Sequence, residues 1–89
     1  MFGGEEAQVT LRFPVDLCGP VYDKFGEQIR IILPPSAEGE CELTETVQIA
    51  DTFFSWVGQF RGEMRITAPE SVREQYREHL RRLMAAAEG

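Results

Sequence analysis

The sequence of 89 residues predicts an α+β domain with four antiparallel strands, two helices on one face of the sheet, and a further helix at the C-terminus. Three observations predict this class. Short segments alternate apolar and polar residues, as strands with one buried face do. The segments between and after them carry apolar residues at intervals of three and four, which is typical of amphipathic helices. Glycines and prolines separate the segments, as expected for turns.

The first strand and the first helix occupy the N-terminal part of the chain. In residues 8–13 every second side chain is apolar, which predicts a half-buried strand. We expect Asp16 to cap the helix that follows, because its carboxylate can accept hydrogen bonds from the free N–H groups of a first turn. Apolar residues recur at every fourth position from Leu17, and Gly26 is the expected end of this helix.

A hairpin is expected next. Residues 28–33 and 41–49 both alternate, and residues 34–39 between them are typical of a turn. Glu45 falls at a position that the alternation predicts to be buried. We therefore expect a bulge or a strand end at Glu45.

The second half of the chain has the same succession of helix and strand. Asp51 is the expected cap of a helix that reaches Phe60, and residues 63–67 are the fourth expected strand. Phe54 falls beside the inward stripe of that helix, so it belongs either to the edge of the core or to an exposed interaction patch. Pro69 suits the first position of a last helix. The apolar residues of that helix at helical spacing are Val72, Tyr76, Leu80, Leu83 and Met84.

The predicted order is βαββαβ followed by a helix, which indicates a ferredoxin-like sandwich. We expect residues 8–87 to form one domain and residues 1–7 to be a flexible lead or a remnant of cloning. No apolar run approaches the roughly 20 residues that span a bilayer. The N-terminus also lacks the basic and apolar regions of a secretory signal. These features predict a cytoplasmic protein without membrane contact.

The charges are distributed unevenly. The net charge is −6, and residues 1–60 contain ten of the 15 acidic residues but three of the nine basic ones. Non-specific binding of duplex nucleic acid requires many cations that neutralise phosphates. Contact with anions is therefore expected only in the C-terminal third or at selected strand positions.

The outward face of the predicted sheet carries Arg12, Arg30 and Arg65 and has no aromatic residue. Sheets of this topology that bind single-stranded RNA stack bases on aromatic side chains, so that mode of binding is not expected. Arg12 and Arg65 fall on neighbouring strands, where like charges require a neutralising partner. The partner is a carboxylate of this domain such as Glu42, a group of a neighbouring subunit, or a nucleic-acid phosphate.

The last helix carries a basic stripe. Three glutamates run beside it at spacings of three and four, close enough to form ion pairs with it. The stripe is therefore either a self-neutralised, solvated surface or a contact for phosphate or for an acidic partner. Its members are Arg73, Arg77, Arg81 and Arg82.

No set of residues typical of catalysis is present. His79 is the single histidine, and without a positioned nucleophile it is expected at the surface or at a boundary. Cys18, Cys41 and His79 are widely spaced and include no CxxC motif, so buried free thiols are favoured over a zinc site. We expect no enzymatic activity, no metal and no cofactor.

The stretch from Trp56 to Arg73 contains an aromatic helix, a glycine turn, one strand and a proline-started helix, and its signature positions are Trp56, Phe60, Gly62 and Pro69. It resembles the C-terminal extension (WCX) module of bacterial transcriptional regulators that contain a WYL domain. The resemblance covers roughly residues 8 to 85. The sequence departs from the family pattern at Arg61, which separates Phe60 from Gly62 and leaves the end of the helix open.

The resemblance implies the ferredoxin-like fold and a regulatory function. Such regulators place a helix-turn-helix domain first, a WYL domain second and the WCX module last. This chain holds neither of the first two segments, so we expect a fragment or a stand-alone relative. The implied function is non-catalytic and contributes to effector sensing and dimer assembly. The implied partners are the regulator's own WYL domain or a second subunit in a homodimer, with weak binding of single-stranded nucleic acid. The alternative is a stand-alone ferredoxin-like module that binds a small ligand or another protein.

Overall fold

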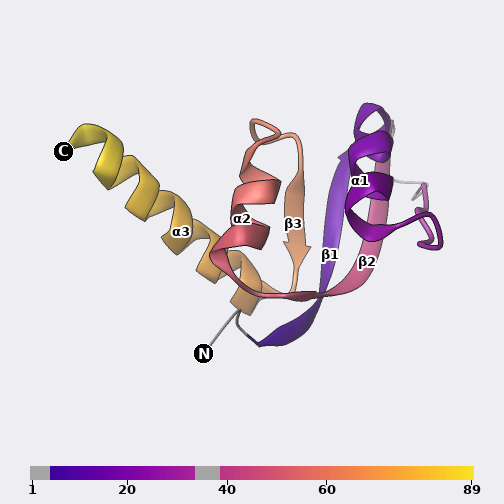
Figure 1. Ribbon diagram of the computed structural model, residues 1–89, viewed down its shortest axis with the longest axis horizontal. Coiled ribbons are helices and arrows are strands. Elements are labelled where there is room, and N and C mark those ends of the chain that lie inside the picture. Colours follow the sequence, from indigo (N-terminus) through magenta and orange to yellow (C-terminus); the bar gives the residue numbers. More distant parts are fainter. Residues whose placement is uncertain (1–4, 34–38) are drawn as a thin grey trace.

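The computed structural model describes residues 5–33 and 39–89, which form an α+β fold. Three strands lie side by side, α1 and α2 lie against one face of the sheet, and α3 leaves the body at one side (Figure 1). The elements are β1 (Glu6–Pro14), a 3-10 turn (Val15–Leu17), α1 (Cys18–Phe25), β2 (Glu40–Gln48), α2 (Asp51–Gly58), β3 (Arg65–Ala68) and α3 (Glu70–Glu88).

The sheet is antiparallel, with the strand order β2-β1-β3. Its central strand β1 buries Val9, Leu11 and Phe13 completely, which confirms the inward side that the alternation predicts. These side chains form one core with the inward residues of β2 and β3, with α1 and α2, and with Val72 from the first turn of α3. The buried part of α2 includes Phe54, which is 5% exposed and therefore belongs to the core.

The structure does not confirm the regular strand predicted over residues 28–33. Within the described residues this segment forms a single antiparallel bridge, in which Ile32 and Glu42 exchange two backbone hydrogen bonds of 2.8 and 2.9 Å. Burial nevertheless follows the predicted alternation in most of the segment. Ile29 and Ile31 pack partly buried against the core, Ile32 is exposed, and the exposed Leu33 departs from the pattern. The bridge places Ile32 at the edge of β2 that faces away from β1. The predicted turn over residues 34–39 lies outside the described residues except for Gly39.

Glu45 marks neither a bulge nor a strand end, contrary to the prediction. It pairs with Val9 in a regular register that runs from Glu6 opposite Gln48 to Pro14 opposite Glu40. Glu45 is half-buried, so the regular strand accommodates a carboxylate at a position that the alternation places inward. The irregularity lies on the other side of β1, where the register with β3 shifts between Thr10 and Leu11.

The predicted caps differ from the observed ones. Asp16 lies in the 3-10 turn and Asp51 is the first residue of α2, and neither side chain caps a helix. Gly26 ends α1 as predicted, with φ of 93° and an N–H that donates to the Tyr22 carbonyl. Pro69 is the residue before α3 rather than its first position, and its carbonyl accepts hydrogen bonds from Val72 and Arg73.

The first strand begins earlier than predicted, and the last helix extends away from the body. Glu6 and Ala7 belong to β1, where they pair with Gln48 and Val47, so the predicted lead over residues 1–7 is too long. Residues 1–4 lie outside the described part. At the other end, α3 contacts the body only through its first half. Val72 is 2% exposed, whereas Leu83 and Met84 are 55% and 64% exposed, and Figure 1 shows this part of α3 projecting from the domain.

Candidate functional site

The outward face of the sheet carries a network of four charged side chains. Arg12 on β1 and Arg65 on β3 are direct register partners, so both point to the same face. Arg12 Nη2 donates to Glu42 Oε2 over 2.9 Å, and both side chains are about three-quarters buried. Arg65 pairs with Glu40, which lies on β2, so its side chain crosses the central strand β1. The neutralising partners of the two arginines are thus carboxylates of this domain.

Arg30 does not join this network. It is exposed and lies in the segment that forms no regular strand, and none of the ion pairs formed by the described residues includes it. The structure therefore brings two of the three predicted sheet arginines together and leaves the third apart. The reason is that Arg30 lies on the outward face of the sheet only if residues 28–33 form a fourth strand.

The basic stripe of α3 is paired with carboxylates of the same helix. Arg73 contacts Glu70, and Arg77 contacts both Glu70 and Glu74, at distances of 2.9, 3.3 and 2.7 Å. Arg81 and Arg82 both pair with Glu78, at 2.9 and 4.0 Å. These residues are substantially exposed, so solvent screens the pairs and each contributes little to stability. The arginines therefore remain available for a stronger anion.

A pocket of about 380 Å³ lies between β3 and the first half of α3. Its apolar lining is made by Met64, Ile66, Tyr76 and Leu80. Its charged lining is made by Arg65, Arg73 and Arg77, with no carboxylate among the lining residues.

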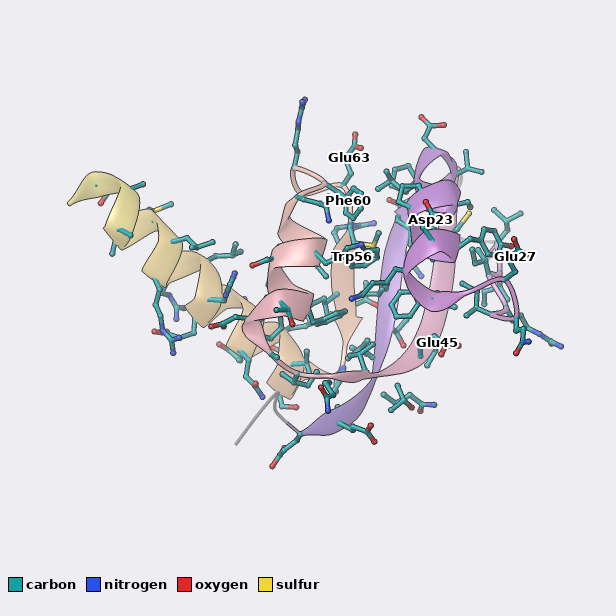
Figure 2. The ribbon with its side chains drawn as sticks, in the orientation of Figure 1. Asp23, Glu27, Glu45, Trp56, Phe60 and Glu63 are labelled. Carbon is teal, nitrogen blue, oxygen red and sulfur yellow. The ribbon has the colours of Figure 1, made fainter. Side chains whose placement is uncertain are left out.

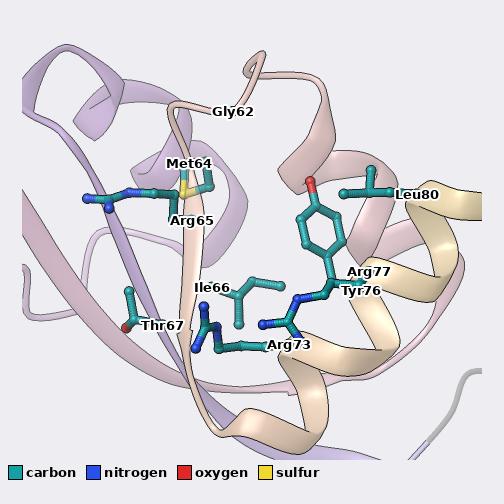
Figure 3. A pocket seen from close by; sticks show the side chains of 9 residues that line it. All are labelled: Gly62, Met64, Arg65, Ile66, Thr67, Arg73, Tyr76, Arg77 and Leu80. Carbon is teal, nitrogen blue, oxygen red and sulfur yellow. The ribbon is translucent and has the colours of Figure 1, made fainter. Parts of the chain in front are cut away.

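Two of these arginines face the pocket interior. In Figure 3 the side chains of Arg73 and Arg77 extend from α3 toward β3, beside Ile66, while that of Arg65 extends to the other side of the strand. The Tyr76 ring lies over the apolar part, and burial raises the pKa of its hydroxyl above the usual value. The pocket therefore combines an apolar floor with two forked cations, a combination that suits an anion with a planar or apolar portion. In the sequence, this pocket is indicated by the pair Arg73 and Arg77, which flanks Tyr76.

The signature positions are spread over the structure. Gly62 lines this pocket, Pro69 precedes α3, and Trp56 and Phe60 form an aromatic group at the end of α2. Trp56 is half-buried and contacts Phe25 and Phe60 edge to face, at ring-centroid distances of 5.6 and 5.2 Å. Figure 2 shows Trp56 and Phe60 together on one side of the molecule. Lys24 Nζ lies 5.6 Å from the centre of the Trp56 ring, within range of a cation–π contact.

The turn after α2 explains how the chain accommodates Arg61. The helix ends at Gly58, and Arg61 and Gly62 both have positive φ, at 61° and 86°. The added residue is thus taken up by a left-handed turn before β3 begins. Arg61 is a non-glycine residue in this conformation, which is uncommon and usually costs energy.

His79 is buried, contrary to the expectation of a surface or boundary position. It is 8% exposed and lies between the rings of Phe54 and Tyr76, at centroid distances of 5.5 and 6.3 Å. Its Nδ1 is 3.4 Å from Asp51 Oδ1, a long contact with an exposed carboxylate. His79 therefore ties α3 to the start of α2.

Within residues 5–33 and 39–89, no helix is both long and apolar enough to cross a membrane. The same residues contain no group of three or more His, Cys, Asp and Glu side chains arranged to hold a metal ion.

The fold and the site define a small α+β module with a basic pocket and a projecting terminal helix. A family model described as the WCX domain matches residues 5–84. The chain belongs to the WCX domain family. No curated protein and no solved structure gives a match to this chain.

Proposed function

We propose that this domain is a non-catalytic, cytoplasmic regulatory module of a WYL-type transcriptional regulator, contributing to assembly and to effector sensing. Membership of the WCX family supports the regulatory role. The observation that carries the assembly role is the exposed apolar stripe on the projecting half of α3. Leu80, Leu83 and Met84 are 41%, 55% and 64% exposed and lie within a little over one helical turn. Exposed apolar residues grouped in this way are typical of interaction surfaces.

A second copy of the chain is the proposed occupant of this stripe. Antiparallel packing of two α3 helices through their projecting halves buries Leu80, Leu83 and Met84 of one copy against the same residues of the other. The regulator's own WYL domain is the competing partner.

Sedimentation velocity of the isolated domain over a range of concentrations tests the assembly role. Leu83→Glu is expected to make the domain monomeric, because it puts a charge in the centre of the stripe. Ala85→Glu is the matched control, since Ala85 lies on the opposite side of the helix. A wild-type domain that is monomeric at every concentration, or a dimer that persists in Leu83→Glu, contradicts dimerisation through α3.

The effector role is proposed for the pocket between β3 and α3. Arg73 and Arg77 supply forked donors for a phosphate or carboxylate, and Tyr76 and Ile66 supply a surface for an attached ring. Single-stranded nucleic acid offers both groups. Because Glu70 and Glu74 compete for the same arginines, we expect this binding to be weak and strongly salt-dependent.

Fluorescence anisotropy with a labelled single-stranded oligonucleotide at two salt concentrations tests the effector role. Arg77→Ala is expected to weaken binding and to reduce the salt dependence, whereas Arg81→Ala, on the same helix but outside the pocket, is expected to leave both unchanged. Equal losses in the two variants indicate non-specific attraction to the helix and contradict a site in the pocket. Thermal stabilisation by a small anionic metabolite without oligonucleotide binding favours the alternative of a stand-alone ligand-binding module.

The ferredoxin-like sheet is part of the proposal. We propose that residues 28–33 extend the bridge at Ile32 into a fourth strand when the domain is assembled. The next hydrogen-bonded pair in such a ladder is Arg30 with Thr44. Hydrogen exchange is expected to show protection of the Arg30 amide in the dimer, and fast exchange there in every state contradicts the fourth strand.

A further inference from the structure

Cys18 and Cys41 lie next to each other although they are far apart in the sequence. Their Sγ atoms are 3.7 Å apart, and 23 positions separate the two residues along the chain. Cys18 is the first residue of α1, and Cys41 is the second residue of β2, opposite Phe13 of β1. Both are free thiols. The sulfur atoms are in van der Waals contact, and an S–S bond of about 2.05 Å requires them to move closer together.

The two thiols differ in accessibility. Cys41 is 2% exposed, whereas Cys18 is half-buried and open to small reagents. Burial, with a contribution from the neighbouring Cys18, raises the pKa of the Cys41 thiol to about 11. Cys41 is therefore protonated at neutral pH and poorly reactive by itself, and Cys18 is the thiol that an oxidant reaches first. The described residues around the pair offer no third ligand for a metal, which leaves thiol chemistry as the reaction that the pair supports.

We propose that Cys18 and Cys41 form a reversible disulfide when the protein meets a peroxide. The Cys18 sulfur attacks one oxygen of hydrogen peroxide, the O–O bond breaks, and Cys18 becomes a sulfenic acid while one water is released. The Cys41 sulfur then attacks Cys18 Sγ and displaces the hydroxyl group, which takes the Cys41 proton and leaves as a second water. In total, two thiols and one peroxide give one disulfide and two waters. A dithiol or low-molecular-weight thiol reverses the reaction by exchange.

The crosslink connects the start of α1 to the start of β2 and closes the intervening chain into a loop. That loop includes Ile32, whose bridge to Glu42 is next to Cys41. A disulfide of this span reduces the conformational freedom of the unfolded chain, and we expect the melting temperature to rise by about 10 °C or more. The inference does not depend on dimerisation or on effector binding, so its failure leaves the proposed function untouched.

Mass spectrometry of the domain before and after limited peroxide treatment tests the inference. The expected product is a monomer that has lost two hydrogens, contains a Cys18–Cys41 crosslinked peptide, melts at a higher temperature and returns to the starting mass with dithiothreitol. Cys41→Ser is expected to accumulate a sulfenic acid at Cys18 that dimedone traps, and Cys18→Ser to react much more slowly. Since either variant can lose stability, the wild-type peptide map is decisive by itself. Wild-type protein that gains oxygen at either sulfur, or that forms crosslinks only between molecules, overturns the proposal.

Discussion

Arg12 and Arg65 lie directly opposite each other on neighbouring strands, and each is neutralised by a different carboxylate of the third strand. Two like charges side by side in a sheet are unfavourable, and the pairing with Glu42 and Glu40 removes that repulsion. Arg12 is the more dependent of the two, because its buried Nε has no hydrogen-bond partner among the described residues and its only ion pair is with Glu42.

Glu42→Gln is therefore expected to lower the free energy of unfolding by about 1–2 kcal/mol, since it leaves a largely buried guanidinium without its counter-charge. Glu78→Gln, which removes the exposed pairs with Arg81 and Arg82, is the matched control and is expected to cost at most about 0.5 kcal/mol. Urea unfolding of both variants measures the difference. Equal effects would show that the sheet pair contributes no more than a surface pair.

The two halves of α3 are expected to respond differently to truncation to alanine. Val72→Ala removes buried methyl groups and is expected to cost about 2 kcal/mol. Leu83→Ala changes a side chain that is 55% exposed and is expected to change the stability of the monomeric domain by less than about 0.5 kcal/mol. Chemical denaturation at a low protein concentration, where association is absent, gives both values. A large loss in Leu83→Ala would mean that α3 folds back onto the body.

Two glycines at the end of α2 are expected to show opposite effects when replaced by alanine. Gly62 has φ of 86°, so Gly62→Ala introduces strain and is expected to cost about 1 kcal/mol. Gly58 is helical, and an added Cβ would make an ordinary contact 3.5 Å from the Tyr76 hydroxyl. Gly58→Ala is thus expected to stabilise the domain by about 0.5 kcal/mol. Thermal melts of the pair check the sign of each change, and a stable Gly62→Ala variant would refute the left-handed turn.

The buried Cys41 thiol predicts a loss of stability at alkaline pH. Its pKa is raised from 9.0 to about 11, mainly by burial, so the unfolded chain ionises before the folded one. The contribution of the protonated thiol to the free energy of unfolding is complete below pH 9 and is lost as the pH rises toward about 11. Under reducing conditions, the urea midpoint of the wild type is expected to fall more steeply over this interval than that of Cys41→Ala. Parallel curves for the two proteins would contradict the raised pKa.

Periodicity predicted which side chains of β1 are buried, because a two-residue repeat fixes the two faces of a strand whatever its neighbours are. Residues 28–33 show the same pattern without forming a regular strand, since an edge strand forms only if its partner edge and its connecting turn hold it in register. Asp16 and Asp51 were predicted as caps from residue type, yet α1 begins two residues after Asp16 and α2 begins at Asp51 itself. The capping preference of a single residue does not set the start of a helix when packing of that helix against the sheet sets it.

The candidate site was predictable in composition but not in geometry. The stripe of arginines on α3 follows from spacing within a single helix, and its pairing with glutamates follows from the same spacing. The pocket requires knowing that Arg73 and Arg77 face Ile66 across a space, which depends on the angle between α3 and β3. The contacts of Arg65 with Glu40, of Cys18 with Cys41 and of His79 with Asp51 join distant segments, so no local pattern contains them.

The sheet offers little room for another chain to add a strand. At one edge β3 has four residues and a shifted register, and at the other edge the backbone of Glu42 is already occupied by Ile32. Short, irregular or covered edges discourage unwanted pairing of sheets between molecules. We therefore expect a second copy, if it binds as proposed, to contact side chains on helices, where a single substitution can alter the choice of partner without disturbing the β-structure.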